Sequence, residues 1–145
     1  MADKTATVHW EGQGKKGVGK ISTQTDALKS YPYGFGSRFE DDRRGTNPEE
    51  LLAAAHAACF TMAFSFVCDA AGFATSAVDT QASVRLVAQS GGFLIDHIAL
   101  SLEASVPGID EATFQKLAAR AKQDCPLSKA LASVPEISLR AVLKN

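Results

Sequence analysis

The residues of this chain best suited to covalent chemistry are two cysteines in contrasting surroundings. Cys59 lies within the apolar stretch "LLAAAHAACFTMAF", and Cys125 lies within the more polar stretch "DCPLS". A thiolate is a strong nucleophile and is readily oxidised, whereas a buried, protonated thiol is inert. Either cysteine could therefore react, provided that its surroundings favour the thiolate.

Cys59 requires a nearby positive charge if it is to react. A buried apolar setting raises the pKa of a thiol, and a cation lowers it. His56 lies three residues earlier and would share a helix face with Cys59. Arg38, in "GFGSRFE", is the stronger candidate, because an arginine stays charged even where it is desolvated. The simpler alternative is that Cys59 packs as a small apolar side chain and that His56 is a core histidine.

The other two cysteines differ in their prospects. Cys125 is followed by Pro126, which suits the first turn of a helix. Helix N-termini stabilise thiolates, so Cys125 could be reactive, and a modest capping role is the alternative. Cys68 lies nine residues after Cys59, on the opposite face of a straight helix, and we expect it to pack in the core.

The composition argues against several other kinds of site. The chain has no Cys-x-x-Cys or His-Glu-x-x-His motif and its three histidines are scattered, so we expect no metal and no other cofactor. A formal net charge of -1 gives no indication of a nucleic-acid partner. The first residues lack an apolar signal-peptide core, which predicts a cytoplasmic protein. We expect no membrane span, because polar residues interrupt the longest apolar stretch, namely His56, Thr61, Ser65 and Asp69.

The element that carries Cys59 is predicted to be a helix of roughly 24 residues. Asn47 can cap it, Pro48 suits its first position, Glu50 has the spacing of a capping box, and Gly72 can end it. This helix is apolar on all sides, so it should be buried on most faces. A helix about 36 Å long is difficult to bury in a domain of this size, and a second copy of the chain would supply the missing cover.

The other elements are predicted from the patterns of apolar and polar residues along the chain. Strands are predicted over "TATVHW" and residues 17–23, and a hairpin over "VDTQASVRLVAQ" and "FLIDHIALSLEASV". The segment "SYPYGFGSRFEDDRRG" lacks a regular period and is predicted to be a loop or an irregular edge. Helices over "GIDEATFQKLAARAKQD" and "CPLSKALAS" and a strand over "EISLRAVL" complete the chain. Segregated strands and helices predict an α+β fold, and 145 residues predict a single domain spanning residues 1–145.

Taken together, these segments resemble the OsmC/Ohr family, and more closely its OsmC branch, the osmotically inducible thiol peroxidases. The resemblance covers nearly the whole chain, and "NPEELLAAAHAACF" together with the much later "CPLS" is its most specific part. It implies an OsmC-like α+β fold, with antiparallel sheets around a long buried central helix, in an intertwined homodimer with two sites at the interface. It also implies a cysteine-based peroxidase that reduces organic hydroperoxides, and hydrogen peroxide less well, and that needs no metal or haem.

The resemblance also implies a role for four residues. Cys59 corresponds to the peroxidatic cysteine and Cys125 to the resolving cysteine. Arg38 corresponds to the arginine that stabilises the thiolate and the transition state, and Glu49 to the glutamate that orients this arginine. Dithiols, notably lipoyl groups on proteins, are the implied reductants. Cys68 is not part of the family pattern.

Helix geometry restricts how these four residues can meet. Glu49 precedes Cys59 by ten residues in one predicted helix, a rise of about 15 Å that no glutamate side chain spans. We therefore expect Arg38 and Glu49 to reach Cys59 from the second chain of the dimer. A disulfide requires the Cα atoms of Cys59 and Cys125 to lie within about 7 Å, and only the tertiary structure can bring them so close.

Two other functions remain open on the residues alone. Cys59 and His56 could act together in a hydrolase or transferase, although this leaves Cys125 and Arg38 without a role and supplies no oxyanion hole. The chain could instead form a non-enzymatic dimer that binds hydrophobic ligands or responds to stress, with its cysteines as packing residues. Only the peroxidase would rapidly lose two thiols per chain on exposure to a hydroperoxide.

Overall fold

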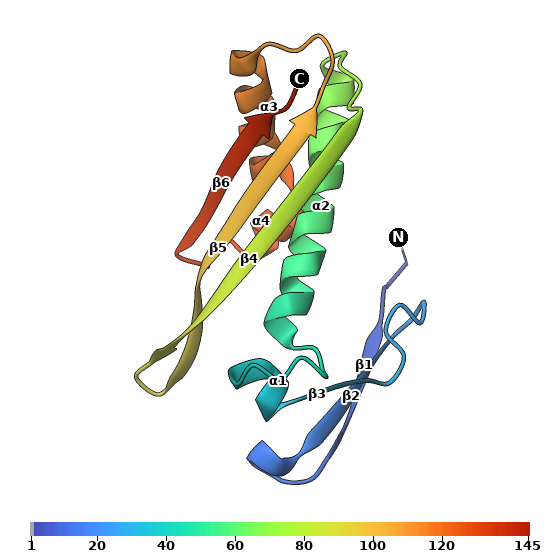
Figure 1. Ribbon diagram of the computed structural model, residues 1–145, viewed down its shortest axis with the longest axis vertical. Helices are drawn as coiled ribbons and strands as arrows, with labels where there is room; N and C mark the ends of the chain where they lie inside the picture. Colours follow the sequence, from blue (N-terminus) through green and yellow to red (C-terminus); the bar gives the residue numbers. More distant parts are fainter. Residues whose placement is uncertain (1) are drawn as a thin grey trace. The chain divides into compact units, whose positions relative to one another are not determined.

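The computed structural model describes residues 2–145 of the chain. These residues form two compact units, one that ends at Leu51 and one that comprises Leu52–Asn145. Helix α2 (Pro48–Ala70) begins in the first unit and continues in the second. The α+β class predicted from the sequence is confirmed, since each unit has its own three-stranded sheet and its own helices (Figure 1).

The first unit is built on an antiparallel sheet in the order β1-β2-β3. Its strands are β1 (Ala6–Glu11), β2 (Val18–Thr23) and β3 (Tyr31–Gly34), and a short 3-10 turn, η1 (Gly14–Lys16), lies between β1 and β2. The predicted loop over residues 30–45 is in part wrong, because it contains β3 and a single helical turn, α1 (Phe35–Phe39). The β3 strand forms because Gly19 lies opposite Tyr33, where any larger side chain would collide with the tyrosine ring.

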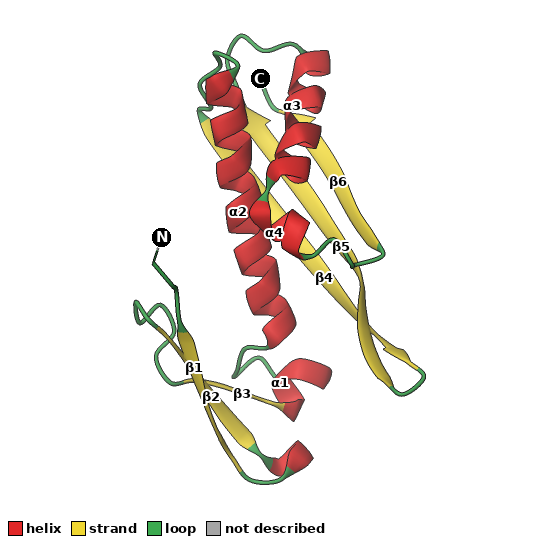
Figure 2. Ribbon diagram, turned by 180° about the vertical axis from the view of Figure 1, so that it is seen from behind, coloured by secondary structure: helices red, strands yellow, loops and turns green. Residues whose placement is uncertain are grey.

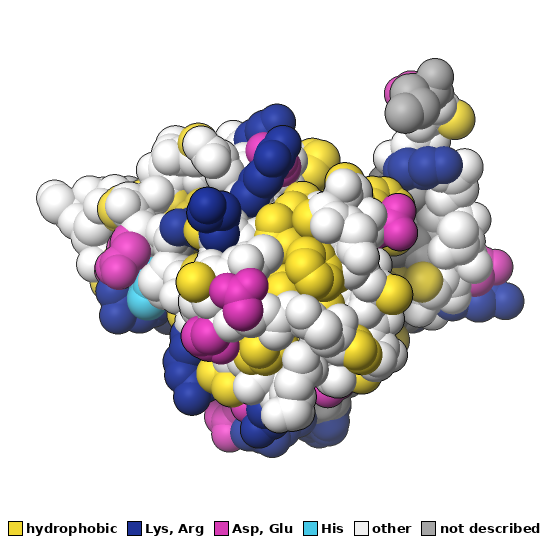
Figure 3. Space-filling view, turned by 90° about the horizontal axis from the view of Figure 1, so that it is seen from above, with side chains coloured by type: hydrophobic (Ala, Val, Ile, Leu, Met, Phe, Trp, Pro, Cys, Tyr) yellow, Lys and Arg dark blue, Asp and Glu magenta, His cyan; other side chains and the backbone are white. Residues whose placement is uncertain are grey.

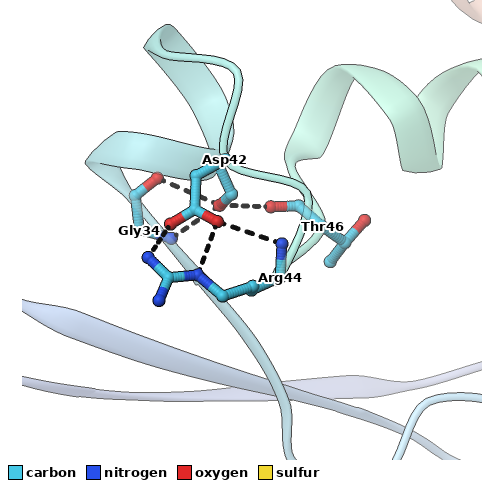
Figure 4. Close-up of polar contacts among 5 residues, drawn as sticks. Gly34, Asp42, Arg44 and Thr46 are labelled. Atoms are coloured by element: carbon cyan, nitrogen blue, oxygen red, sulfur yellow. Dashed lines mark hydrogen bonds and ion pairs between the residues drawn. The ribbon is translucent and has the colours of Figure 1, made fainter.

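A network of short polar contacts holds α1 beside the start of α2 within the first unit (Figure 4). The Ser37 hydroxyl donates to the Thr46 carbonyl at 2.7 Å and accepts from the Gly34 N–H at 3.0 Å. In the same turn, Asp42 accepts two hydrogen bonds from the Arg44 guanidinium, both at 2.9 Å. These hydrogen bonds from Arg44 lower the pKa of Asp42 to about 2, so the pair stays charged across the physiological range.

The second unit contains the larger sheet, in the order β4-β5-β6. Its strands β4 (Ala77–Gln89) and β5 (Gly92–Ser105) form the predicted antiparallel hairpin. The last strand, β6 (Glu136–Leu143), pairs with β5 in parallel, so this sheet is mixed rather than wholly antiparallel as expected. The parallel pairing follows from the connection, because α3 (Glu111–Asp124) and α4 (Pro126–Ala130) carry the chain back to the starting end of β5.

Helices α2, α3 and α4 lie on one face of this sheet (Figures 1 and 2). The core between them is formed by fully buried side chains from α2, β5 and α3, which include Phe60, Phe64, Ile98, Leu102 and Phe114. Exposed and inward-facing residues alternate along β4, as expected for a strand with one covered face. The helices therefore build a continuous apolar layer against the sheet.

Helix α2 begins and ends at the residues predicted from the sequence. Asn47 accepts the Glu50 N–H at 2.7 Å, which satisfies a free amide of the first turn. Gly72 has φ +87°, a conformation that favours glycine, and it allows the Phe73 N–H to reach the Cys68 carbonyl. The Glu50 side chain departs from a capping box, since it accepts from the Thr46 hydroxyl instead.

Within one chain, α2 is covered on a single face. Its fully buried residues are spaced four apart, and they are His56, Phe60, Phe64 and Cys68. The expectation that most faces are buried is thus not met by one chain alone. Met62 and Phe66 are 60% and 67% exposed. By length and composition α2 would be able to span a membrane, a test that core helices also pass, and 22% of its most apolar window is buried.

Replacing Phe64 with alanine should destabilise the second unit severely. Phe64 is fully buried and its ring meets the Phe114 ring edge-on at a centroid distance of 5.7 Å. Removing a buried phenylalanine side chain costs about 3–5 kcal/mol, because apolar contacts are lost and a cavity remains. Urea unfolding measures this loss. The control is Lys116, which is exposed on α3 two residues after Phe114, and Lys116→Ala should cost less than about 1 kcal/mol. Equal losses would contradict the assigned core.

Candidate active site

The second unit brings Cys59 and Cys125 into direct contact. Cys125 Sγ donates a hydrogen bond to Cys59 Sγ at 3.1 Å, although 66 residues separate the two in sequence. Both are free thiols, and Cys59 is half-buried whereas Cys125 is fully buried. Little movement would be needed to convert this contact into a disulfide, whose sulfurs lie about 2.05 Å apart.

Cys125 owes its position to the corner between α3 and α4. Its N–H donates to the Ala121 carbonyl and so ends α3, while its carbonyl accepts from the Lys129 N–H at the start of α4. Pro126 is the first residue of α4, and a residue before proline is driven out of the helical conformation. Cys125 accordingly has ψ 122°, which turns the chain sharply between the two helices.

A backbone amide that the sequence analysis did not identify also reaches Cys59. The backbone amide of Leu127, the second residue of α4, favours the thiolate of Cys59 and so acts to lower its pKa. An amide at the start of α4 thus acts on Cys59. Pro126 was the signal that could have revealed it, because the amides after a first-turn proline lack partners in their own helix.

The Cys59 thiol is nevertheless disfavoured as a thiolate within one chain. Burial raises the pKa of Cys59 above its ordinary value, the Leu127 amide opposes this rise, and the neighbouring Cys125 adds to it. Among residues 2–145, no cationic side chain contributes to lowering it. The sequence argument that Cys59 needs a cation to react thus applies to the structure as well.

A largely apolar cavity of about 570 Å³ opens beside Cys59. Its lining comes from one face of α2 and from α3 and α4, and includes Cys59, Met62, Phe66, Val67, Leu117 and Pro126. Arg120 and Asp124, paired at 3.3 Å, contribute its polar part. Figure 3 shows the molecule from above, where hydrophobic side chains at the surface lie beside charged ones.

From the sequence, the candidates for apolar walls that could bury the alkyl chain of a peroxide are Phe35, Phe39, Phe60 and Met62. The structure matches this expectation only in part. Of the candidates, Met62 lines the cavity, whereas Phe60 points into the core and is fully buried. Phe35 and Phe39 belong to the first unit, where the centroids of their two rings lie 5.1 Å apart. Phe66 was missed, although it lies four residues after Met62 on the same helix face.

Arg38 and Glu49 form a second pair, in the first unit. The guanidinium of Arg38, on α1, donates to the Glu49 carboxylate, on α2, through two nitrogens, with a shortest distance of 2.7 Å. Such a two-pronged contact fixes the plane of the guanidinium. The Arg38 side chain remains 36% exposed and has donors left for another acceptor, whereas the Glu49 side chain is only 12% exposed.

The remaining candidates are buried. Cys68 lies in the core, as expected, and burial raises the pKa of its thiol. His56 is fully buried, with its Nε2 atom 2.8 Å from the Ser128 hydroxyl. Within residues 2–145, no group of three histidine, cysteine or acidic side chains is arranged to hold a metal ion.

The site therefore combines two thiols in contact with an apolar cavity, on an α+β scaffold. The sequence matches the OsmC family, described as OsmC-like protein, over residues 39–140, and the chain belongs to this family. It is 48% identical to peroxiredoxin OsmC of Escherichia coli (strain K12) over 142 residues, which cover 98% of this chain and 97% of the relative.

More distant relatives carry a second name. The chain is 36% identical to an organic hydroperoxide resistance protein of Xanthomonas axonopodis pv. citri (strain 306) over 115 residues, or 79% of this chain and 77% of that one. Its fold resembles the crystal structure of an organic hydroperoxide resistance protein from Elizabethkingia anophelis, with a TM-score of 0.75 and 27% identity. That match covers 99% of this chain and 98% of the other.

Proposed function

We propose that this chain is a cysteine-based peroxidase of organic hydroperoxides in which Cys59 is the peroxidatic and Cys125 the resolving cysteine. The observation that carries the proposal is the 3.1 Å contact between the two sulfurs beside an apolar cavity. Membership of the OsmC family and the names of the relatives, peroxiredoxin OsmC and organic hydroperoxide resistance protein, support the same activity.

The reaction proceeds in two steps whose atoms balance. The Cys59 thiolate attacks one peroxide oxygen and the O–O bond breaks, which gives a sulfenic acid on Cys59 and, after protonation, an alcohol. The Cys125 thiol then attacks the sulfenic sulfur, so that a disulfide forms and water leaves. An external dithiol restores both thiols by exchange and becomes a disulfide itself.

Arg38 and Glu49 supply the charge that Cys59 lacks. The Arg38 guanidinium stabilises the thiolate and then the alkoxide that develops as the peroxide breaks, while Glu49 holds it in place. Glu49 and Cys59 lie ten residues apart in α2, so one helix cannot present both to the same peroxide. We assign the pair at each Cys59 to the second chain of a homodimer, in which two such sites form at the interface.

The exposed apolar residues of α2 support this dimer. Met62 and Phe66 lie beside Cys59 on a face that one chain leaves open. In the proposed dimer, a second copy of the chain covers this face and completes the wall of the cavity. Residues 1–145 then form a single OsmC-like domain. If the face were instead covered by a membrane, the protein would partition into detergent or lipid.

The cavity selects for hydroperoxides with apolar groups. Each methylene buried against such walls contributes about 0.8 kcal/mol, which hydrogen peroxide cannot gain. The reductant in this proposal is a dithiol such as a protein-bound lipoyl group, and the enzyme acts in the cytoplasm, a reducing compartment in which thiols are kept free. No metal or other cofactor takes part in these steps.

The alternatives account for fewer of these contacts. A hydrolase using Cys59 and His56 requires the imidazole to contact the thiol, but among residues 2–145 its Nε2 atom contacts Ser128 and its Nδ1 atom has no hydrogen-bond partner, Cys59 included. A binding protein without activity leaves the contact between two thiols without a role.

Thiol counting after a single equivalent of an alkyl hydroperoxide tests the proposal. The wild-type protein should lose two of its three thiols per chain within the mixing time, and peptide mass spectrometry should find Cys59 linked to Cys125 in one chain. Cys68 should remain free. Survival of the peroxide together with three free thiols would overturn the proposal, and rapid loss of Cys68 would overturn the assignment of the pair.

A further inference from the structure

His56 is a buried polar residue to which the two-step reaction assigns no role. Its side chain is fully inaccessible and lies on the otherwise apolar buried face of α2, with Phe60 and Phe64. Its contact with the Ser128 hydroxyl, at 2.8 Å, joins two residues that are 72 positions apart. This is a long-range polar contact at the centre of the second unit.

The imidazole depends on this one contact. Among residues 2–145, Nδ1 of His56 has no hydrogen-bond partner. Burial lowers the pKa of His56, so the ring is neutral at neutral pH. A neutral ring joined to Ser128 either donates through Nε2 or accepts there, and in both tautomers Nδ1 remains unpaired. The bond to Ser128 is therefore the contact through which this residue can influence its surroundings.

The same contact joins the two helical turns that carry the reacting groups. His56 lies one turn before Cys59 in α2, and Ser128 lies three residues after Cys125 in α4. Helix α4 comprises only five residues, and Cys125 is the residue directly before it. The position of α4 therefore affects both the Cys125 thiol and the Leu127 amide, which act on the Cys59 thiol. A shift of α4 along α2 would disturb both contacts together.

We infer that His56 is a positioning residue that, through Ser128, holds α4 against α2 so that Cys125 faces Cys59 for disulfide formation. This inference rests on the proposed roles of the two cysteines. The step that it affects most is the attack of the Cys125 thiol on the Cys59 sulfenic acid, because a displacement of about 1 Å can slow an oriented reaction by about 10²-fold. The first step is affected less, because in the proposed function the Arg38 guanidinium supplies most of the stabilisation of the Cys59 thiolate and the Leu127 amide adds only a part.

Ser128→Ala is the most informative variant. Ser128 is half-buried and lies within a helix, where alanine is well tolerated, so the variant should fold. Samples mixed with one equivalent of cumene hydroperoxide are quenched over time, and mass spectrometry counts the sulfenic acid, the disulfide and the sulfinic acid of Cys59. We expect disulfide formation to slow by about ten- to a hundred-fold while sulfenic acid formation changes little. With excess peroxide, the sulfinic acid should accumulate, because an unresolved sulfenic acid is oxidised further.

Conservative and double variants separate positioning from packing. Ser128→Thr retains the hydroxyl and should resolve the sulfenic acid at nearly the wild-type rate. His56→Gln puts an amide in place of Nε2 and should give a similar rate. His56→Leu removes the hydrogen bond and should match Ser128→Ala in disulfide rate. Because the two residues act through one bond, the double variant should be no slower than the slower single variant.

The outcomes distinguish the inference from the proposed function. Wild-type rates of disulfide formation and wild-type sulfinic acid yields in Ser128→Ala would overturn the positioning role and leave the peroxidase intact. A slow rate in Ser128→Thr equal to that in Ser128→Ala would also overturn it. If wild-type protein forms neither a sulfenic acid nor a disulfide, the proposed function fails and the inference fails with it.

Discussion

Replacing Cys59 with serine should abolish the reduction of organic hydroperoxides. The serine hydroxyl has the size of the thiol but does not ionise near neutral pH and does not attack the O–O bond, so the turnover rate should fall by at least about 10³-fold. Peroxide consumption with a dithiol reductant measures this loss. A Cys59→Ser protein that retains a tenth of the wild-type rate would disprove the peroxidatic role.

The other two cysteines provide matched variants for the same assay. Cys125→Ser should complete the first step once and then retain a Cys59 sulfenic acid, which can be trapped chemically and seen by mass spectrometry. Cys68→Ala removes a thiol that lies in the core and away from the cavity, so its turnover rate should stay close to the wild-type value. Loss of activity in a folded Cys68→Ala protein would show that Cys68 takes part in turnover and would contradict the assignment of the reacting pair.

Mixed dimers should reveal that Arg38 acts on the Cys59 of the other chain. We expect Arg38→Ala alone to lower kcat/KM by about 10²- to 10³-fold, because the arginine stabilises both the thiolate and the developing alkoxide. When Arg38→Ala and Cys59→Ser chains are refolded together, each mixed dimer contains one site with an intact Cys59 and an intact Arg38. Activity should therefore reappear, up to half of the wild-type value per mixed dimer.

The pH dependence of Cys59 alkylation gives an independent reading of the same interaction. Burial raises the pKa of Cys59 in one chain, and a guanidinium from the second chain should lower it. Removing Arg38 should therefore move the alkylation profile to higher pH, with less thiolate at every pH below the new pKa. Arg43→Ala is the control, because Arg43 is 88% exposed and pairs with Asp41 on the surface.

Three results would contradict this arrangement. Mixed dimers that remain inactive would place Arg38 and Cys59 of one site in the same chain. An active, stable monomer would remove the need for the second chain. A large loss in Arg120→Ala, with none in Arg38→Ala, would assign the cationic role to the arginine that lines the cavity instead.

Local sequence signals were sufficient for most of the elements. The ends of α2 are predicted by residues that act only on their near neighbours. Asn47 accepts a backbone amide, Pro48 has a preset φ, and Gly72 adopts a positive φ. None of these effects requires knowledge of the fold. The β4–β5 hairpin is equally local, since two alternating segments flank a glycine pair. The same reasoning failed for β3, which has no alternation of its own and forms because β2 offers it a pairing edge beside Gly19.

The faces of α2 could be grouped from sequence but not oriented. Helical spacing places Met62 with Phe66, and Phe60 with Phe64, on two different faces. Both faces are apolar, so periodicity alone could not decide which one meets the sheet and which one lines the cavity. Packing decided this, and it sent Phe60 into the core while leaving Phe66 beside Cys59.

By itself, the sequence determined the kinds of groups available and the ends of the elements that carry them, because residue chemistry and capping act locally. Only the tertiary structure decided that Cys125, the Leu127 amide and Ser128 all meet the same stretch of α2. Residues 66 positions apart have no local interaction, and their approach depends on how α3 and α4 pack against the sheet. The same packing decides whether the Cys59 sulfur is an inert core atom or one partner of a reactive pair.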